Sequence, residues 1–400
     1  MHPSATRPVE QDDELHNSMA INASETVESN TPASTWRAES PEAALRVVHI
    51  IKHCGYGNGS VHVAVDLACV QAQAGYDVTF VSSGGTFEPM LAQHTVRHLT
   101  LRHDQGKPFA MLRTALKLAG LARRTRPHVL HAHMMSSAVV GYIASKLSGV
   151  PLVTTVHNSF DRHSLLMRLG RRVVAVSDAE REHLLSQGYN RNRLVAVMNA
   201  PDKSPREEFM HNDREITINK PCIMTTSALH QRKGVFDVID ACSQIFAEHP
   251  QWTLYIAGEG PDREKLEQQV SSLGLKNRVI FLGFLPAPRP LLDRADIFVL
   301  ASYADPCSLA VGEARAAGCA IVATNVGGTP EMLEFGRAGR LVFPGKPKQL
   351  AAELRRLMAD DNLRERLRRA SLLGSEVFDV HRLVRDYEAV YRGALGEKSR

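Results

Sequence analysis

The chain has 400 residues and a hydrophobic content of 44%, which suits two domains that each bury a core of their own. It contains no run of 18 apolar residues and no signal-peptide hydrophobic segment, so we expect a protein that neither spans a membrane nor is exported by that route. Its cysteines have no C-x-x-C or metal-ligand spacing, which favours a reduced, cytoplasmic protein without a metal site.

Charge is distributed unevenly along the chain. Residues 1–44 carry 2 Lys and Arg against 8 Asp and Glu, residues 45–200 carry 18 against 8, and residues 201–400 carry 28 against 27. The positive excess of the middle segment favours an anionic partner. Because no nucleic-acid-binding signature accompanies it, we expect an anionic membrane surface rather than nucleic acid. Residues 1–44 are polar with few large apolar side chains, and we predict a disordered tail there.

From residue 45 onward, short apolar runs alternate with helical patterns. Strands are predicted at residues 46–51, 77–82, 129–131, 152–156 and 173–176. The loop after the first strand contains Gly57 and Gly59, which would let the backbone approach a ligand closely. This loop lacks the third glycine of a dinucleotide-binding fingerprint. The alternation of strands and helices predicts an α/β fold with a doubly wound parallel sheet.

Residues 109–126 are predicted to form an amphipathic helix rich in cations. The cations considered are Arg113, Lys117, Arg123 and Arg124. Most amphipathic helices of α/β domains pack on the sheet, but cationic ones also dock on anionic lipid. Both interpretations stay open, and the second would put these residues on the acceptor or membrane side of the protein.

Two histidines follow predicted strands, His133 after residues 129–131 and His157 after residues 152–156. In open α/β sheets ligands bind at the carboxyl ends of the strands, so we expect both to face a cleft. The alternative is a histidine that only orders a loop. For the neighbouring His131 that alternative is the simpler one.

Residues 201–220 are polar and contain proline, and we predict that they form a hinge between two domains. A second series of strands and helices begins near residue 223. Arg232 and Lys233 lie in its first strand-to-helix turn, and Gly258 follows a predicted strand. This second series predicts another doubly wound sheet.

The most informative stretch follows a predicted strand at residues 297–300. A helix is expected to start near Ser308 and to stop at Gly318, and Glu313 stands in it among mostly small or apolar residues. The start of a helix can hold phosphate, and a carboxylate beside it can accept from sugar hydroxyls, which suits a nucleotide sugar. Alternatively, Glu313 pairs with a nearby arginine.

Residues 305–331 resemble the donor-site signature of glycosyltransferase family 4, the retaining GT-B enzymes. The matching features are Asp305, seven intervening residues, Glu313, a small-residue helix, an apolar strand and a final Gly-Gly-Thr-Pro-Glu. The resemblance implies that Asp305 faces the donor sugar and that Glu313 holds the ribose. It also implies that Lys233 neutralises the donor diphosphate and that His157 lies on the acceptor-facing side of the sugar, so the expected catalytic residues are His157, Asp305 and Lys233.

The donor-binding set implied in this way consists of Gly57, Gly59, Arg232, Lys233, Gly258, Ser308, Leu309 and Glu313, and His133 is placed on the acceptor side. The chain departs from the family at several positions. The family usually has Glu at position 305, Phe-Gly at 307 and 308, Arg at 227 and Gly at 200, where this chain has Asp305, Cys307, Ser308, Ser227 and Ala200. Arg232 could substitute for the arginine that is absent at position 227.

The implied activity is a metal-independent, retaining transfer of a hexose-type sugar from a UDP- or GDP-linked donor, with no cofactor, to a glycan or glycolipid in cell-surface polysaccharide or glycolipid synthesis. No D-x-D motif follows a strand. The expected organisation is a tail (1–44), an acceptor-binding domain (45–200), a hinge (201–220), a donor-binding domain (221–378) and a helix that crosses back (379–400). We expect peripheral binding at the cytoplasmic face of the inner membrane.

Two alternatives remain. One is a nucleotide-sugar epimerase on the same fold, and the other is a non-catalytic lipid-binding scaffold, which the departures from the family pattern suggest. A nicotinamide oxidoreductase is disfavoured because the dinucleotide fingerprint is incomplete.

Overall fold

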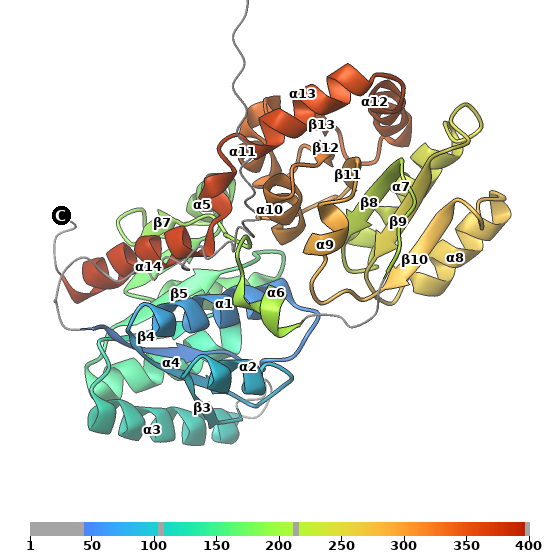
Figure 1. The fold of residues 1–400 in the computed structure, drawn as a ribbon. Helices are drawn as coiled ribbons and strands as arrows, with labels where there is room; N and C mark the ends of the chain where they lie inside the picture. Colours follow the sequence, from blue (N-terminus) through green and yellow to red (C-terminus); the bar gives the residue numbers. More distant parts are fainter. Residues whose placement is uncertain (1–43, 103–107, 211–215, 397–400) are drawn as a thin grey trace, which may run out of the picture. The chain divides into compact units, whose positions relative to one another are not determined.

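The computed structural model describes residues 44–102, 108–210 and 216–396. Within them the chain forms two parallel β-sheets with helices packed against them (Figure 1). The predicted α/β fold with two doubly wound sheets is therefore confirmed. The tail predicted at residues 1–44 lies outside the described residues except for Ala44.

The first sheet has seven strands in the order β3-β2-β1-β4-β5-β6-β7. Its strands are β1 (Arg46–Ile50), β2 (Asp77–Ser82), β3 (Arg97–Thr100), β4 (Val129–Ala132), β5 (Leu152–Val156), β6 (Arg172–Ala175) and β7 (Leu194–Ala196). Its helices are α1 (Gly59–Gln73), α2 (Glu88–Gln93), α3 (Pro108–Thr125), α4 (Met135–Ser148) and α5 (Asp178–Ser186), with the 3-10 segment η1 (Arg162–Leu169) after β5. Strand β3 was not predicted, because its sequence RHLT contains no apolar run.

The second sheet has six strands in the order β10-β9-β8-β11-β12-β13. These are β8 (Cys222–Thr226), β9 (Thr253–Ala257), β10 (Val279–Gly283), β11 (Ile297–Leu300), β12 (Ala320–Thr324) and β13 (Arg340–Val342). The helices are α7 (Val235–Ser243), α8 (Arg263–Ser272), α9 (Arg289–Leu292), α10 (Leu309–Ala316), α11 (Thr329–Met332), α12 (Pro347–Ala359) and α13 (Asp361–Leu372), with 3-10 segments η2 (Gln231–Lys233), η3 (Glu334–Gly336) and η4 (Ser375–Phe378).

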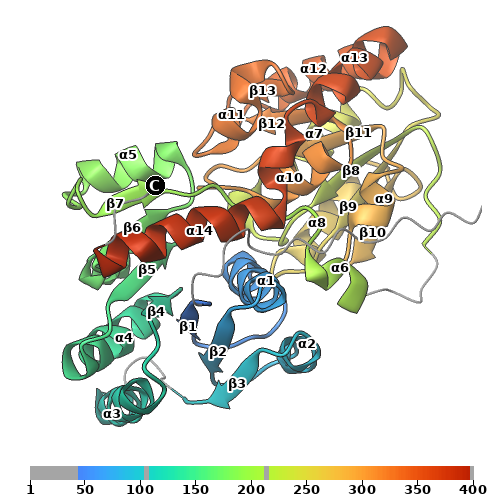
Figure 2. The same cartoon turned by 60° about the vertical axis from the view of Figure 1, so that its left-hand side comes forward.

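Successive residues of the first sheet face opposite cores, as the two-residue period of a strand requires. Val48 and Leu130 pack with side chains of α3 and α4. Val47 and Val129 pack instead with α1 and with the last helix, α14 (Val380–Leu395). Figure 2 shows α14 lying beside α1 over β4, β5 and β6, although it follows the second sheet in sequence. One face of the first sheet is thus covered by the C-terminal end of the described chain.

The two chain segments that join the sheets run side by side. Asp202, on the way out of the first sheet, exchanges backbone hydrogen bonds of 2.8 and 3.0 Å with Phe378 and Val380. Lys203 adds an ion pair of 2.6 Å to Asp379. The short helix α6 (Pro205–Phe209) follows on the outgoing segment. Residues 211–215 of the predicted hinge lie outside the described residues.

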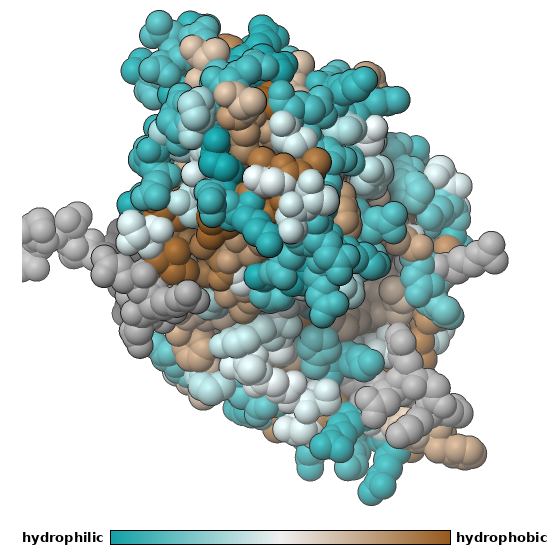
Figure 3. All heavy atoms as spheres, turned by 90° about the vertical axis from the view of Figure 1, so that its right-hand side faces the viewer, coloured by the Kyte–Doolittle hydropathy of each residue, from teal (hydrophilic) through white to brown (hydrophobic). Residues whose placement is uncertain are grey.

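The molecular surface is mainly polar on the face that Figure 3 presents. Hydrophilic residues cover most of this face, and hydrophobic ones show between them in smaller groups.

Candidate active site

Strand order reverses at one point in each sheet, between β1 and β4 in the first and between β8 and β11 in the second. At such a point the loops after the two neighbouring strands turn to opposite faces and leave a crevice at their carboxyl ends. The loop after β8 carries Lys233 and the loop after β11 carries Asp305. The glycine-rich loop with Gly57 and Gly59 follows β1. The topology therefore gathers residues that are far apart in the sequence.

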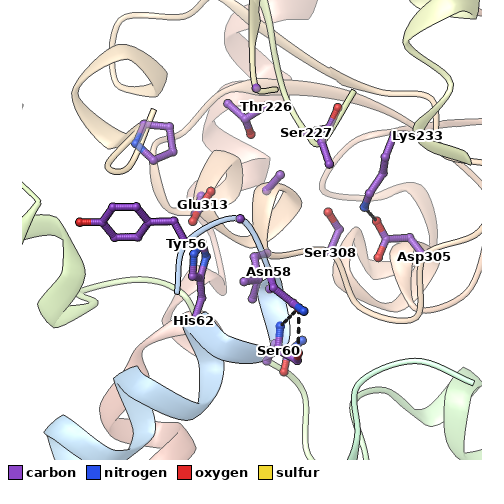
Figure 4. A pocket seen from close by; sticks show the side chains of 18 of the residues that line it. Tyr56, Asn58, Ser60, His62, Thr226, Ser227, Lys233, Asp305, Ser308 and Glu313 are labelled. Atoms are coloured by element: carbon purple, nitrogen blue, oxygen red, sulfur yellow. Dashed lines mark hydrogen bonds and ion pairs between the residues drawn. The ribbon is translucent and has the colours of Figure 1, made fainter. Parts of the chain in front are cut away.

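A cavity of about 530 Å³ lies at these carboxyl ends and is lined from both sheets (Figure 4). The lining includes the predicted donor-binding residues Gly57, Gly59, Arg232, Lys233, Gly258, Ser308, Leu309 and Glu313, together with His157 and Asp305. This volume lies within the range of small-molecule sites.

Lys233 and Asp305 are paired inside the cavity wall. The Lys233 ammonium Nζ donates to Asp305 Oδ2 at 2.6 Å, and the side chains are only 17% and 7% exposed. Gly234 holds the turn that presents Lys233. Its φ of 66° is left-handed, and an added Cβ would lie 1.9 Å from the Ala301 carbonyl oxygen. The lysine therefore sits on a backbone turn that only glycine can close.

Arg232, its neighbour, is held differently. Its guanidinium donates to the Ala304 carbonyl at 2.6 Å and lies over the Phe160 ring with its Cζ 4.8 Å from the ring centroid. Phe160 follows β5 of the first sheet, so this cation-π contact joins the two halves of the cavity wall. Arg232 thereby braces the loop before Asp305.

The backbone of residues 305–308 is held from both sheets. Ser177 and Asn199 of the first-sheet region donate to the carbonyls of Pro306 (2.7 Å) and Cys307 (3.2 Å). Gly327, which follows β12, packs against this loop from the second sheet. The approach is so close that an added Cβ would lie 2.0 Å from the Asp305 carbonyl oxygen. This loop leads into α10, whose first N–H groups are orphan donors that suit an anion.

Helix α10 begins at Leu309 as predicted, with Ser308 in the N-cap position. The Ser308 side chain makes no capping hydrogen bond to the described residues, which leaves its hydroxyl for other partners. In the view of Figure 4, Ser308 lies between Glu313 and the Lys233–Asp305 pair. The three features therefore line one continuous wall.

Glu313 is not paired with an arginine, which settles the alternative raised by its spacing. Its carboxylate has no ion pair or hydrogen bond within the part of the chain that the structure describes. Burial raises the pKa of Glu313, and the nearby Arg206 partly offsets the effect. Arg206 itself donates from Nε and Nη2 to both oxygens of Asp66 at 2.8 to 3.0 Å. A half-buried carboxylate for which the described residues supply no partner therefore lines the cavity.

Other polar atoms of the lining are also unsatisfied. His62 Nε2, Thr226 Oγ1 and Ser227 Oγ are buried and have no hydrogen-bond partner in the described ranges. Buried polar groups are nearly always hydrogen-bonded in native proteins. Their arrangement around one cavity indicates a polar ligand with several hydroxyl or phosphate groups.

His157 is half-buried in the lining, and burial lowers its pKa to about 3. Its Nε2 lies 3.2 Å from Nδ1 of His133. His133 was expected on the acceptor side, and this expectation is corrected: it is 2% exposed, does not line the cavity and contacts His157 from behind. His131 is fully buried and hydrogen-bonded to Thr155 and Tyr391. This agrees with the simpler interpretation, in which the histidine orders its surroundings and does not face the cleft.

His49, His131 and His133 bring ring nitrogens within 4.8 Å of one another, a spacing that a metal ion could use. All six of their ring nitrogens already take part in hydrogen bonds to Gln71, Thr155, Tyr391 or a neighbouring histidine. These six nitrogens make five hydrogen bonds, because His49 Nδ1 and His133 Nε2 bond to each other. The cluster is therefore a hydrogen-bonded network rather than a set of open ligands.

The predicted cationic helix corresponds to α3, which packs against α4. Arg113, Lys117, Arg123 and Arg124 are all exposed, and Arg123 also donates to the Leu147 carbonyl at 2.6 Å near the end of α4. Arg123 is thus a structural contact. Apolar side chains of α3 are exposed as well, Phe109 at 86%, and Leu112 and Leu116 at about half. None of the described helices is both long and apolar enough to cross a bilayer.

Several lining residues were missed by sequence reasoning. Arg206 lies in the segment predicted as a hinge, and the only signal for it was the Ser204-Pro205 start of a helix. Tyr56 of the glycine-rich loop was missed as well, and its ring approaches that of Phe284 from the other sheet with ring centroids 5.8 Å apart. Outside the lining, Glu331 lies in the first turn of α11 and also accepts from the backbone N–H of Asp178 at 2.8 Å, at the start of α5. These roles depend on contacts between distant segments.

Two parallel sheets that share a cavity at the carboxyl ends of their strands define the GT-B class of glycosyltransferases. The sequence matches the family described as "Glycosyltransferase Family 4" over residues 57–204 and the family described as "Glycosyl transferases group 1" over residues 206–372. Together the two matches cover both sheets, and the chain belongs to the family of glycosyltransferases that they describe. The resemblance predicted from residues 305–331 is thereby confirmed.

Relatives of known name support this assignment to the glycosyltransferases. The chain is 27% identical over 361 residues to N-acetyl-alpha-D-glucosaminyl L-malate synthase of Bacillus anthracis, covering 84% of this chain and 94% of that one. It is 30% identical over 281 residues to glycogen synthase of Mycobacterium tuberculosis, covering 66% and 68%. It is 25% identical over 332 residues to the lipopolysaccharide core biosynthesis glycosyltransferase LpsE of Rhizobium meliloti, covering 81% and 92%.

Solved structures share the fold. A glycosyltransferase from Rickettsia africae superposes with a TM-score of 0.76 at 19% identity, covering 88% of this chain and 99% of that one. HepE of Anabaena, solved with UDP and glucose, superposes with a TM-score of 0.74 at 22% identity, covering 87% and 100%. The protein is a glycosyltransferase with the GT-B fold.

Proposed function

We propose that the protein transfers a hexose-type sugar from a nucleotide-diphosphate sugar, UDP- or GDP-linked, to a glycan or glycolipid acceptor, with retention of configuration and without a metal ion. The supporting observation is the cavity wall that runs from the Lys233–Asp305 pair past the start of α10 to the unpaired carboxylate of Glu313. In this proposal Asp305 faces the sugar, Lys233 and the start of α10 face the diphosphate, and Glu313 accepts from the ribose hydroxyls. The solved HepE complexes contain UDP with glucose and UDP-glucose.

In this proposal, catalysis consists of stabilising separated charge. As the bond between the sugar and the diphosphate breaks, negative charge grows on the leaving phosphate and positive charge on the sugar ring. Lys233 and the first N–H groups of α10 stabilise the phosphate, and Asp305 stabilises the ring. His157 binds a sugar hydroxyl beside them. Glu313 holds the ribose in both the bound donor and the transition state.

The acceptor side is proposed to lie at a membrane. α3 exposes Phe109, Leu112 and Leu116 beside the exposed cations Arg113, Lys117 and Arg124, a combination that suits an anionic lipid surface. We therefore place the protein peripherally on the cytoplasmic face of the inner membrane, in the synthesis of a cell-surface polysaccharide or glycolipid. LpsE of Rhizobium meliloti is named for lipopolysaccharide core biosynthesis.

Release of free nucleotide tests the proposal. UDP- and GDP-hexoses are supplied in turn with and without membrane extract as acceptor, and free UDP or GDP is quantified with the sugar recovered. Transfer predicts nucleotide release that rises with acceptor. An epimerase would convert the sugar without releasing nucleotide, and a scaffold would leave the donor intact. Either result would overturn the proposal.

A further inference from the structure

A row of buried hydrogen bonds leads from the cavity into the first sheet. His157 Nε2 lies 3.2 Å from His133 Nδ1, and His133 Nε2 lies 2.9 Å from His49 Nδ1. His49 Nε2 lies 2.8 Å from Oε1 of Gln71. His49 and His133 are at most 2% exposed, and Gln71 is fully buried. The wall of the cavity is thus connected to a glutamine on α1 through two further rings.

The same row continues beyond Gln71. Its Nε2 donates to the Tyr391 hydroxyl at 3.3 Å, which lies 2.9 Å from His131 Nδ1. His131 Nε2 lies 2.8 Å from the Thr155 hydroxyl, which meets Tyr387 at 2.9 Å. The strand register explains this alignment: His49 and His131 are direct partners on β1 and β4, and both face α1 and α14. Seven hydrogen bonds form one chain.

A neutral imidazole has one donor nitrogen and one acceptor nitrogen, so the direction of each bond in such a chain determines the next. Burial keeps these rings neutral, lowering the pKa of His49 to about 4 and those of His131 and His133 well below the usual value. The whole chain can run in either direction, and reversing it exchanges donor and acceptor on every ring. The orientation of the Gln71 amide selects one direction, because its acceptor Oε1 faces His49 and its donor Nε2 faces the Tyr391 hydroxyl.

We infer that Gln71 is a positioning residue that sets the tautomer of His157 through His49 and His133. The Gln71 oxygen accepts from His49 Nε2–H, so His49 Nδ1 accepts from His133 Nε2–H, and His133 Nδ1 accepts from His157 Nε2–H. His157 is then left with Nδ1 as a lone-pair acceptor, and no residue that the structure describes hydrogen-bonds to this atom. We infer that the group that donates to His157 Nδ1 is a hydroxyl of the sugar. This part of the inference rests on the proposed function.

Histidine tautomers are read directly by NMR. The full-length protein, labelled with 15N in its histidines, gives ring-nitrogen spectra in which Nδ1–H and Nε2–H tautomers have different shifts, and single His157→Gln and His133→Gln variants assign the signals. The expected result at neutral pH is the Nε2–H tautomer for His157, His133 and His49. An Nδ1–H form of His157, or a mixture in the wild type, would overturn the inference.

Variants at Gln71 separate positioning from stability. Gln71→Met removes the acceptor for His49, so we expect mixed tautomers at His157 and a roughly two- to tenfold lower kcat/KM for the donor. Gln71→Glu keeps a carbonyl-type acceptor for His49, so the Nε2–H signature and most of kcat/KM should return even though a buried acid is costly. Equal losses in Gln71→Met and Gln71→Glu, with the His157 tautomer unchanged, would assign Gln71 a merely structural role.

Tyr391→Phe is the matched control, because it cuts the chain on the far side of Gln71. We expect lower thermal stability with an unchanged His157 signature and donor kcat/KM. A changed His157 tautomer in this variant would contradict the assignment to Gln71. The NMR result does not depend on activity: a wild type with the expected tautomer that turns over no nucleotide sugar would count against the proposed function and not against this inference.

Discussion

Lys233 and Asp305 form a 2.6 Å ion pair across the point where the strand order of the second sheet reverses. Each neutralises the charge of the other. A donor diphosphate that binds at the start of α10 would compete with Asp305 for the ammonium. The pair therefore neutralises two charges at the wall of the cavity, and donor binding would separate them.

We predict that Lys233→Ala weakens donor binding more than Arg232→Ala does. A charge-assisted contact contributes about 1.5 to 3 kcal/mol, so the lysine variant should lose roughly 10- to 150-fold in affinity. Arg232 is already occupied by the Ala304 carbonyl and the Phe160 ring. Isothermal titration with UDP- or GDP-hexose measures the two effects, and circular dichroism controls for folding. Similar losses in both variants, or a larger one for Arg232, would show that the phosphate role was assigned to the wrong cation.

Asp305 and Glu313 should affect different kinetic constants. Glu313→Gln should mainly raise the donor KM, roughly tenfold or more, because a ribose contact is the same in the bound donor and the transition state. Asp305→Asn should lower kcat on the order of 100-fold, because its charge matters as the ring becomes positive. Asp305→Glu should keep substantial activity. Initial-rate kinetics distinguish the variants, and full kcat and KM in both Asp305→Asn and Glu313→Gln would favour the scaffold alternative.

As the pH is lowered, donor affinity should begin to fall at a higher pH than it would if the cavity contained a carboxyl group of ordinary pKa. Burial raises the pKa of Glu313, so protonation begins above the usual range as the pH is lowered. A protonated acid accepts less strongly from ribose hydroxyls, and affinity is therefore present at neutral pH and lost on acidification. Titrations between pH 5 and 8 should show this slope in the wild type and a flatter one in Glu313→Gln. An identical slope in that variant would assign the pH dependence to another group.

The buried Asp66–Arg206 pair should carry a large part of the stability where α6 meets α1. Both side chains are at most 5% exposed, and Asp66→Asn leaves the guanidinium without a full charge partner. Removing one member of such a pair costs about 3 to 5 kcal/mol. The exposed Arg263–Glu267 pair is the control, and Glu267→Gln should cost at most about 1 kcal/mol. Urea unfolding measures both, and equal effects would mean that the buried pair is no more important than a surface one.

Membrane binding should depend on the exposed face of α3. Arg113→Glu with Lys117→Glu should weaken sedimentation with vesicles that contain anionic lipid, and Leu112→Ser with Leu116→Ser should do so too. The control is Lys346→Glu with Lys348→Glu. These two exposed cations lie at the start of α12, a helix of the second sheet, so the charge change is the same and vesicle binding should stay intact. Nucleotide affinity should be unaffected in all three. Equal binding to neutral and anionic vesicles would contradict the proposal.

The sequence by itself determined the α/β class, most strands and the donor-site signature. Buried parallel strands read as apolar runs, and glycines, caps and the Asp305–Glu313 spacing are local features that need no knowledge of the fold. The identities of Lys233, Asp305 and Glu313 as lining residues could be predicted for this reason. The edge strand β3 could not, since pairing with β2 rather than its own polar sequence makes it a strand.

Only the tertiary structure decided which residues meet. Lys233 and Asp305 are 72 positions apart, and Asp66 and Arg206 are 140 apart. The local sequence around one residue of each pair does not predict that the fold brings the other residue to it. The burial of His131 against Tyr387 and Tyr391 depends on a helix that returns from the C-terminal end to cover the first sheet. Hydrogen bonds and ion pairs act over a few ångströms, so their partners are set by how the chain folds back on itself.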